Sequence, residues 1–180
     1  MRVLRMAVVA AATLALLTTP ASAAPGGSAN GDFVVGGGLR IGPDGVVPNR
    51  SFSVNARTLP IGEPSGHYTF LVLGEKAHFT GEVTCVDVVG DHAVIGGHIA
   101  TGNLGAGEDF LVFLIDRGDP EVGQPGPDSV SLSYVTSEGF WPASDIPGDF
   151  PATCPDADGD AHDRAEYRDV QGNIVVNDGN

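Results

Sequence analysis

The chain has 180 residues, with 23 acidic and 9 basic side chains and a formal net charge of −14. Glycine (26 residues) and proline (13 residues) are frequent, and 42% of the residues are hydrophobic. These numbers argue against a coiled coil, a long helical bundle and a disordered acidic tail. They also argue against nucleic acid as a partner, because binding to phosphates needs clustered Lys and Arg. They are typical of one globular domain with many turns.

The N-terminus has the pattern of a secretory signal peptide. Arg2 and Arg5 precede an uncharged, mostly apolar run at 6–17, and an A-x-A cleavage pattern ends at Ala23. The run is shorter than the about 20 apolar residues that a membrane anchor needs. We therefore predict a signal peptide at 1–23, a single secreted β-domain at 24–180 and no membrane anchor after cleavage.

After the signal peptide, short runs of alternating or β-branched residues are separated by Gly- and Pro-rich turns, which is typical of strands. No window shows the i, i+3, i+4, i+7 spacing of an amphipathic helix. In chain order, the predicted strands cover 32–41, 50–57, 67–73, 77–89, 92–101, 109–116, 129–136, 166–170 and 173–177.

These strands predict an all-β fold. Short connections between consecutive strands favour antiparallel pairing, and this many strands protect their edges best in a closed structure. We predict an antiparallel β-barrel of about eight or nine strands, closed by a C-terminal hairpin that turns at Gln171-Gly172. A two-sheet β-sandwich is the alternative. The run at 109–116 is almost continuously apolar, which predicts a strand buried on both faces.

One hairpin can be registered from the sequence. The turn at 89–92 has Gly at the first central position, as type II′ turns prefer. This register places Cys85 opposite Gly96 and Val83 opposite His98. The first face then carries Phe79, Val83, Cys85, Val94 and His98, and the second carries Val86, Val88, Ala93, Ile95 and Ile99. Because both faces are largely apolar, we expect one to line the barrel and the other to lie under a loop.

The two cysteines after the signal peptide are Cys85 and Cys154. In an oxidising compartment they are expected to form one disulfide across about 70 residues. A metal-thiolate pair or a catalytic thiol is the alternative, although C-x-x-C spacing is missing. Gly96-Gly97 in mid-strand implies that another group needs the space, and the disulfide opposite Gly96 is the expected occupant.

Several segments together resemble a known family. These are 52–56 (FSVNA), 79–86 (FTGEVTCV), 90–97 (GDHAVIGG), 116–118 (DRG) and 172–176 (GNIVV). The pattern resembles small, uncharacterised secreted proteins of high-GC Gram-positive bacteria. The resemblance implies an all-β fold and secretion, and it implies no activity or catalytic residue.

An acidic segment near the C-terminus is a candidate calcium site. Carboxylates at alternate positions suit a hard cation that takes six to eight oxygen ligands. The pattern departs from an EF-hand loop, since Ala161 replaces the turn Gly and Tyr167 replaces the bidentate Glu. The alternative is a solvated acidic loop, and no other cofactor is expected. The candidate ligands are Asp156, Asp158, Asp160 and Asp163.

The other candidate residues are histidines and aromatics. His92 and His98 lie about 20 Å apart along one strand and cannot share a metal, but His67 or His78 from a neighbouring strand could complete a site. No nucleophile motif or phosphate-binding loop is present. Phe140 and Trp141 form either a platform that binds a ligand or partner, or a plug for one barrel end.

We expect the chain to be a secreted, non-catalytic module that binds an extracellular ligand or partner protein through its loops or barrel mouth. A small enzyme that uses the barrel cavity, of the isomerase or cyclase kind, is one alternative. A structural or inhibitory surface protein is another. A deep polar cavity favours the enzyme, and a filled interior favours the binding module.

Overall fold

The computed structural model describes residues 31–41, 48–59, 62–118, 127–131, 134–135 and 148–179. The predicted signal peptide lies outside these residues. The elements are β1 (Phe33–Ile41), β2 (Pro48–Thr58), β3 (Pro64–Val72), β4 (His78–Val89), β5 (His92–Gly102), β6 (Asp109–Ile115), β7 (Ser129–Ser131), β8 (Tyr134–Val135), α1 (Asp160–Arg164) and β9 (Tyr167–Asn177).

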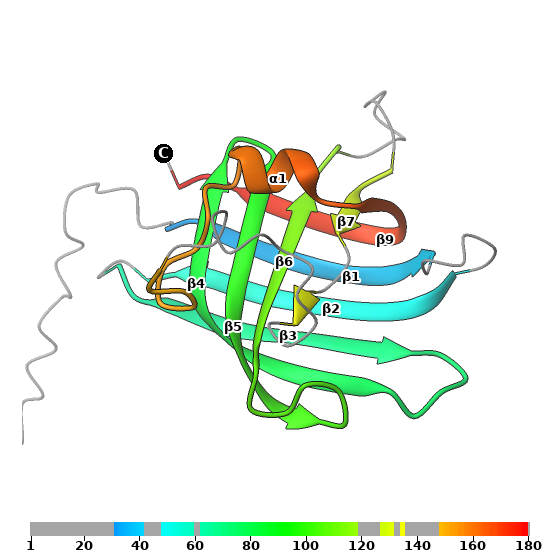
Figure 1. Ribbon diagram of the computed structural model, residues 1–180. Helices are drawn as coiled ribbons and strands as arrows, with labels where there is room; N and C mark the ends of the chain where they lie inside the picture. The colour runs from blue at the N-terminus through cyan, green and yellow to red at the C-terminus, as the bar shows by residue number, and fades with distance from the viewer. Residues whose placement is uncertain are drawn as a thin grey trace, which may run out of the picture.

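The described strands form a closed, antiparallel β-barrel with eight strand positions (Figure 1). From β1 to β6, each strand pairs with the next one in the chain. β7 and β8 both pair with β6, and together they correspond to the predicted strand at 129–136. β9 pairs with β7 and with β1, which closes the barrel. The barrel prediction is confirmed, and the sandwich alternative is wrong.

The predicted C-terminal hairpin is wrong, because β9 is one continuous strand. Its pairing with β1 runs without a break from Phe33↔Asn177 to Arg40↔Val170. Gly172 is therefore not a turn residue. A Cβ at Gly172 would lie 2.1 Å from the backbone oxygen of Gly37. The glycine permits the close approach of two paired strands.

Packed side chains from the inward faces of the strands fill the barrel interior. Rings from four strands are in contact there, with centroid distances of 6.4 Å for Phe52–Tyr68, 5.5 Å for Tyr68–Phe110 and 5.9 Å for Phe79–Phe110. Space for the Phe110 ring comes from two glycines. A Cβ at Gly81 would lie 2.2 Å from this ring, and one at Gly97 would lie 3.0 Å from it. The Cβ at Gly97 would also lie 1.9 Å from the Glu82 carbonyl oxygen, so Gly97 lies against the paired strand β4 and a core ring, and not against the disulfide.

A buried arginine also reaches through the interior. The Arg40 residue on β1 is 2% exposed. Its guanidinium lies 5.2 Å from the centroid of the Phe70 ring, and Nη1 donates a hydrogen bond of 3.0 Å to the Ser131 carbonyl. Arg40 therefore connects β1 to β7 across the position of β9.

A second apolar core lies outside the barrel wall. All of β6 after Asp109 is buried, which confirms the prediction that this strand is covered on both faces. The cover is residues 148–165, which we call the strap. The strap includes α1, which lies across the outer side of the wall near the ends of β5 and β6 (Figure 1). The outer core consists of Cys85, Val94, Leu111, Phe113, Cys154, Ala157 and Ala161.

The predicted hairpin register is correct from Val89↔His92 to Cys85↔Gly96 and then shifts. Thr84 is an extra residue in β4, so Val83 pairs with Gly97 and not with His98. An extra residue reverses the alternation of side chains along a strand. Phe79 and Val83 consequently lie in the interior core, whereas Cys85 and Val94 lie in the outer core. The prediction that these residues share a face with His98 is wrong.

Two aspartates, the buried Asp128 and the half-buried Asp116, replace a stretch of ladder between β6 and β9, where β7 is short. The Ile174 N–H donates to Asp128 Oδ2 at 2.6 Å, and the Val176 N–H donates to Asp116 Oδ2 at 3.0 Å. Asp128 also accepts from the Arg117 N–H at 3.0 Å. These carboxylates satisfy backbone donors that would otherwise need a neighbouring strand. Part of the acidity of the chain therefore has a structural role.

Closure by β9 can be tested by truncation. A chain that ends at residue 165 should fail to fold cooperatively, because β1 and β7 then lose their shared partner. A chain that ends at residue 177 keeps all of β9 and should fold. Far-UV circular dichroism during thermal unfolding provides the measurement. A sharp unfolding transition in the shorter chain would contradict the closure.

Candidate functional site

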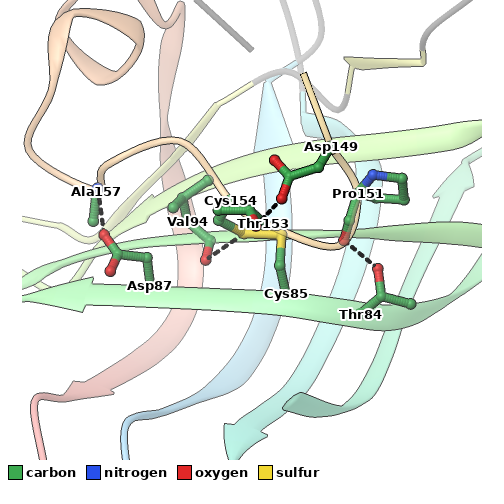
Figure 2. Close-up of a disulfide and its surroundings, with 9 residues drawn as sticks. All are labelled: Thr84, Cys85, Asp87, Val94, Asp149, Pro151, Thr153, Cys154 and Ala157. Carbon is green, nitrogen blue, oxygen red and sulfur yellow. Dashed lines mark hydrogen bonds between the residues drawn. A yellow bond between two sulfur atoms is a disulfide. The ribbon is translucent and has the colours of Figure 1, made fainter. Parts of the chain in front are cut away.

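The strap is covalently attached to the outer wall of the barrel. Cys85 on β4 and Cys154 form the predicted disulfide, with a Cα–Cα distance of 5.4 Å (Figure 2). The bond lies over Gly96, as predicted. A Cβ at Gly96 would lie 2.8 Å from Cys85 Sγ and 2.6 Å from the Phe150 ring. Gly96 thus provides the space in which the strap meets the wall.

Hydrogen bonds fix the strap on both sides of the disulfide (Figure 2). The bulged Thr84 donates from Oγ1 to the Pro151 carbonyl at 2.6 Å. On the other side, the Ala157 N–H donates to Asp87 Oδ2 at 2.7 Å. Within the strap, Thr153 Oγ1 donates to Asp149 Oδ2 at 2.7 Å. The strap is therefore held at several points along its length.

The Asp87 carboxyl lies in an unfavourable electrostatic environment. Burial raises its pKa above the usual value of 3.8, and the nearby carboxylates of Asp156 and Asp158 raise it further. The hydrogen bond from Ala157 opposes this shift because it stabilises the ionised form. The net effect is that folding disfavours the charged carboxylate.

A pair of histidines lies in contact between α1 and β5. His162 is buried, and its ring centroid lies 4.3 Å from that of His92 and 5.2 Å from that of Tyr167. Burial lowers the pKa of His162, and the neighbouring His92 lowers it further, while Asp163 opposes the shift. The folded protein therefore favours neutral His162. The associated stability is present above pH 6.5 and is lost as the pH falls through the lowered pKa.

The four aspartates of the candidate calcium site do not converge. Asp160 lies in α1, with Oδ2 3.8 Å from Nη2 of Arg164, and Asp163 Oδ1 lies 3.7 Å from Nδ1 of His162. Asp156 and Asp158 are exposed. No three His, Cys, Asp or Glu side chains are grouped to hold a metal ion among the residues that the structure describes. The structure therefore gives the calcium prediction no support.

The strap instead presents an acidic surface. Over residues 148–165, which are all described, the exposed carboxylates outnumber the single arginine, Arg164. Asp160 lies near Arg164, Asp163 lies near His162, and Asp149 accepts a hydrogen bond from Thr153. The exposed carboxylates are Asp149, Asp156, Asp158, Asp160 and Asp163, and the exposed Glu166 directly after the strap pairs with Arg168.

Two predicted site residues remain untested. Phe140 and Trp141 lie outside the described residues, so the predicted aromatic platform stays a prediction. The sequence reasoning missed Asp87 and the His92–His162 contact, because both depend on a strap whose course over the wall has no periodic signal. The five-residue helix α1 was also not predicted, since it is too short to show an amphipathic repeat.

Comparison with known protein families, with curated proteins and with solved structures finds no match to this chain. The resemblance to small secreted bacterial proteins therefore stays a prediction. Over the described residues, no helix combines the length and the apolar character that crossing a membrane requires.

Removal of the disulfide should destabilise the protein substantially. The two cysteines are 69 residues apart, and closing a loop of this size contributes about 4 kcal/mol in the chain-entropy estimate. The paired change Cys85→Ser and Cys154→Ser should lower the free energy of unfolding by several kcal/mol. Urea unfolding of both proteins measures the difference. An unchanged midpoint would show that the bond contributes nothing to stability.

The raised pKa of Asp87 predicts a specific pH dependence. Asp87→Asn keeps an oxygen that accepts from Ala157 and removes the disfavoured charge. When the pKa of a carboxyl is raised by folding, the native protein loses stability as the pH rises through that pKa. The stability of the variant minus that of the native protein should therefore be larger at pH 7 than at pH 3. Asp87→Leu removes the acceptor and should be less stable at both pH values. Thermal unfolding at the two pH values measures this, and a difference that does not change with pH would contradict the shift.

Proposed function

We propose that this protein is a secreted, non-catalytic binding module whose acidic strap binds a basic protein partner outside the cell. The observation that carries the proposal is the set of exposed carboxylates on a segment held rigidly by a disulfide and several hydrogen bonds. A surface that is already ordered loses little conformational entropy on binding. Clustered charge of one sign also accelerates association with a partner of the opposite sign.

The packing inside the barrel supports binding at the outer surface. An enzyme that works in a barrel cavity needs space for its substrate among the inward-facing side chains. In the described strands these positions hold tightly packed rings, including the fully buried Tyr68 and Phe110. This packing supports the proposal that the barrel is a scaffold and that recognition takes place on its exterior.

The N-terminal pattern and the disulfide support the extracellular part of the proposal. The pattern at 1–23 is that of a secretory signal peptide. A structural disulfide forms and persists in oxidising compartments, and the Cys85–Cys154 bond is compatible with such a location. The net negative charge disfavours anionic partners such as nucleic acids, which leaves basic proteins as the favoured class.

Binding of a cationic probe to the purified protein tests the proposal. We expect a fluorescent decalysine peptide to bind at low salt, with affinity falling as the NaCl concentration rises because exposed charges are screened. The paired change Asp156→Asn and Asp158→Asn should weaken binding about fivefold or more. The matched control is Glu63→Gln and Glu75→Gln, which removes the same charge from exposed residues outside the strap.

The control pair should retain most of the native affinity. Equal weakening by both pairs would show that binding depends only on net charge and not on the strap. Absence of binding to decalysine at low salt would also contradict the proposal. Fluorescence anisotropy measures the affinity, and circular dichroism verifies that each variant is folded.

A further inference from the structure

A row of titratable side chains crosses the outer wall of the barrel, two residues along β4 and β5 from the strap contacts at Thr84 and Gly96. It takes one residue from each of four adjacent strands, β3, β4, β5 and β6. The residues are directly opposite one another in the strand register, as His67↔Glu82, Glu82↔His98 and His98↔Asp109. The next residue along each strand is buried in the interior, namely Tyr68, Val83, Ile99 and Phe110. Because side chains alternate along a strand, the row faces outward.

The bulge at Thr84 creates this row. Without the extra residue, the register of the 89–92 turn would place Glu82 opposite Ile99, whose side chain points into the barrel. The shift instead places Glu82 opposite His98 on the outer face. Bulges commonly re-aim side chains next to functional sites.

The His98–Asp109 pair resembles the support that proteins give to metal-binding histidines. Nδ1 of His98 lies 2.5 Å from Oδ1 of Asp109. An N–H donated from Nδ1 to this carboxylate leaves the lone pair on Nε2, which is free to bind a metal. Carboxylates fix the tautomer and the ring orientation of metal-binding histidines in this way. The His98 side chain is 60% exposed, so an ion can approach it from solvent.

The spacing of the strands places three donor groups within reach of one ion. Adjacent strands are about 4.8 Å apart, so the backbones of His67 and His98 are separated by roughly 10 Å with Glu82 between them. In the conformations of the structure, the described side chains do not form a group of three metal ligands. His67 and Glu82 are exposed, however, so their side chains can change rotamer while His98 keeps its hydrogen bond to Asp109. The His67 imidazole and the Glu82 carboxylate can then turn toward Nε2 of His98.

We propose that His67, Glu82 and His98 bind a zinc ion on the outer wall of the barrel, with Asp109 positioning His98. Two imidazoles and one carboxylate suit zinc, which binds nitrogen and oxygen ligands at about 2.0–2.2 Å. Three protein ligands leave a fourth tetrahedral position for water. This site is independent of the proposed partner-binding strap, since it shares no residue with it.

Calorimetric titration of the purified, untagged protein with ZnCl₂ tests the site. One equivalent of zinc should bind, and His67→Ala or His98→Ala should each weaken binding at least tenfold. Asp109→Asn should weaken binding by about 10- to 100-fold, the usual range for such supporting groups. His78→Ala is the matched control, because His78 is also exposed on β4 but lies roughly 13 Å along the strand from Glu82.

The control variant should bind zinc as the native protein does. Cobalt(II) offers a second readout, since its visible absorption bands report nitrogen and oxygen ligation and should disappear in His98→Ala. No heat and no change in melting temperature at 1 mM zinc would overturn the proposal. So would native affinity in His98→Ala, or equal loss of affinity in His78→Ala. Thermal unfolding without metal establishes that each variant is folded.

Discussion

The fold depends on one constraint, which is that the part of the β4–β6 wall around Cys85, Val94 and Phe113 is apolar on both faces. A closed barrel buries only its inner face, so the outer face of these strands needs a separate cover. The strap supplies that cover and creates the outer core beside the filled interior. The disulfide, the Thr84 bulge and Gly96 all belong to this arrangement, because each one helps to seat the strap on the wall.

The acidic residues fall into two groups with different physical roles. Asp116 and Asp128 accept hydrogen bonds from backbone N–H groups of β9 where a neighbouring strand is missing, and Asp87 does the same for the strap. Replacing these carboxylates would affect stability first. The exposed carboxylates of the strap have no comparable structural role apart from local contacts, such as the hydrogen bond that Asp149 accepts from Thr153. This division is the reason that the strap, and not the whole acidic surface, is the proposed binding face.

Much of the fold was predictable because local signals agreed with the global structure. Alternating runs and Gly-rich turns indicated strands, the II′ turn set the register near Gly90, and two lone cysteines indicated one bridge. The Thr84 bulge was not predictable, because an extra residue leaves no mark in a sequence that is apolar on both faces. The continuity of β9 was also missed. Gln171-Gly172 resembles a turn, and only the opposing Gly37-Gly38 explains the glycine.

The same bulge explains why the candidate sites were harder to predict than the fold. The simple register separates Glu82 and His98 onto opposite faces, whereas the observed register places them side by side. The His92–His162 contact depends in turn on where the strap crosses the wall. In this chain, irregularities such as the bulge bring the candidate site residues together, and the regular periodicity of the sequence does not reveal them.

Hydrogen exchange measured by mass spectrometry on the oxidised and the reduced protein tests the two-core account most directly. If the disulfide holds a separate outer core, reduction should accelerate exchange in the strap and at Cys85 and its neighbours on β4. The pairing of β1 with β2 and β9 should remain protected, because the interior core does not depend on the bond. Unchanged protection of the strap after reduction would contradict the account, and so would an equal loss of protection in every strand.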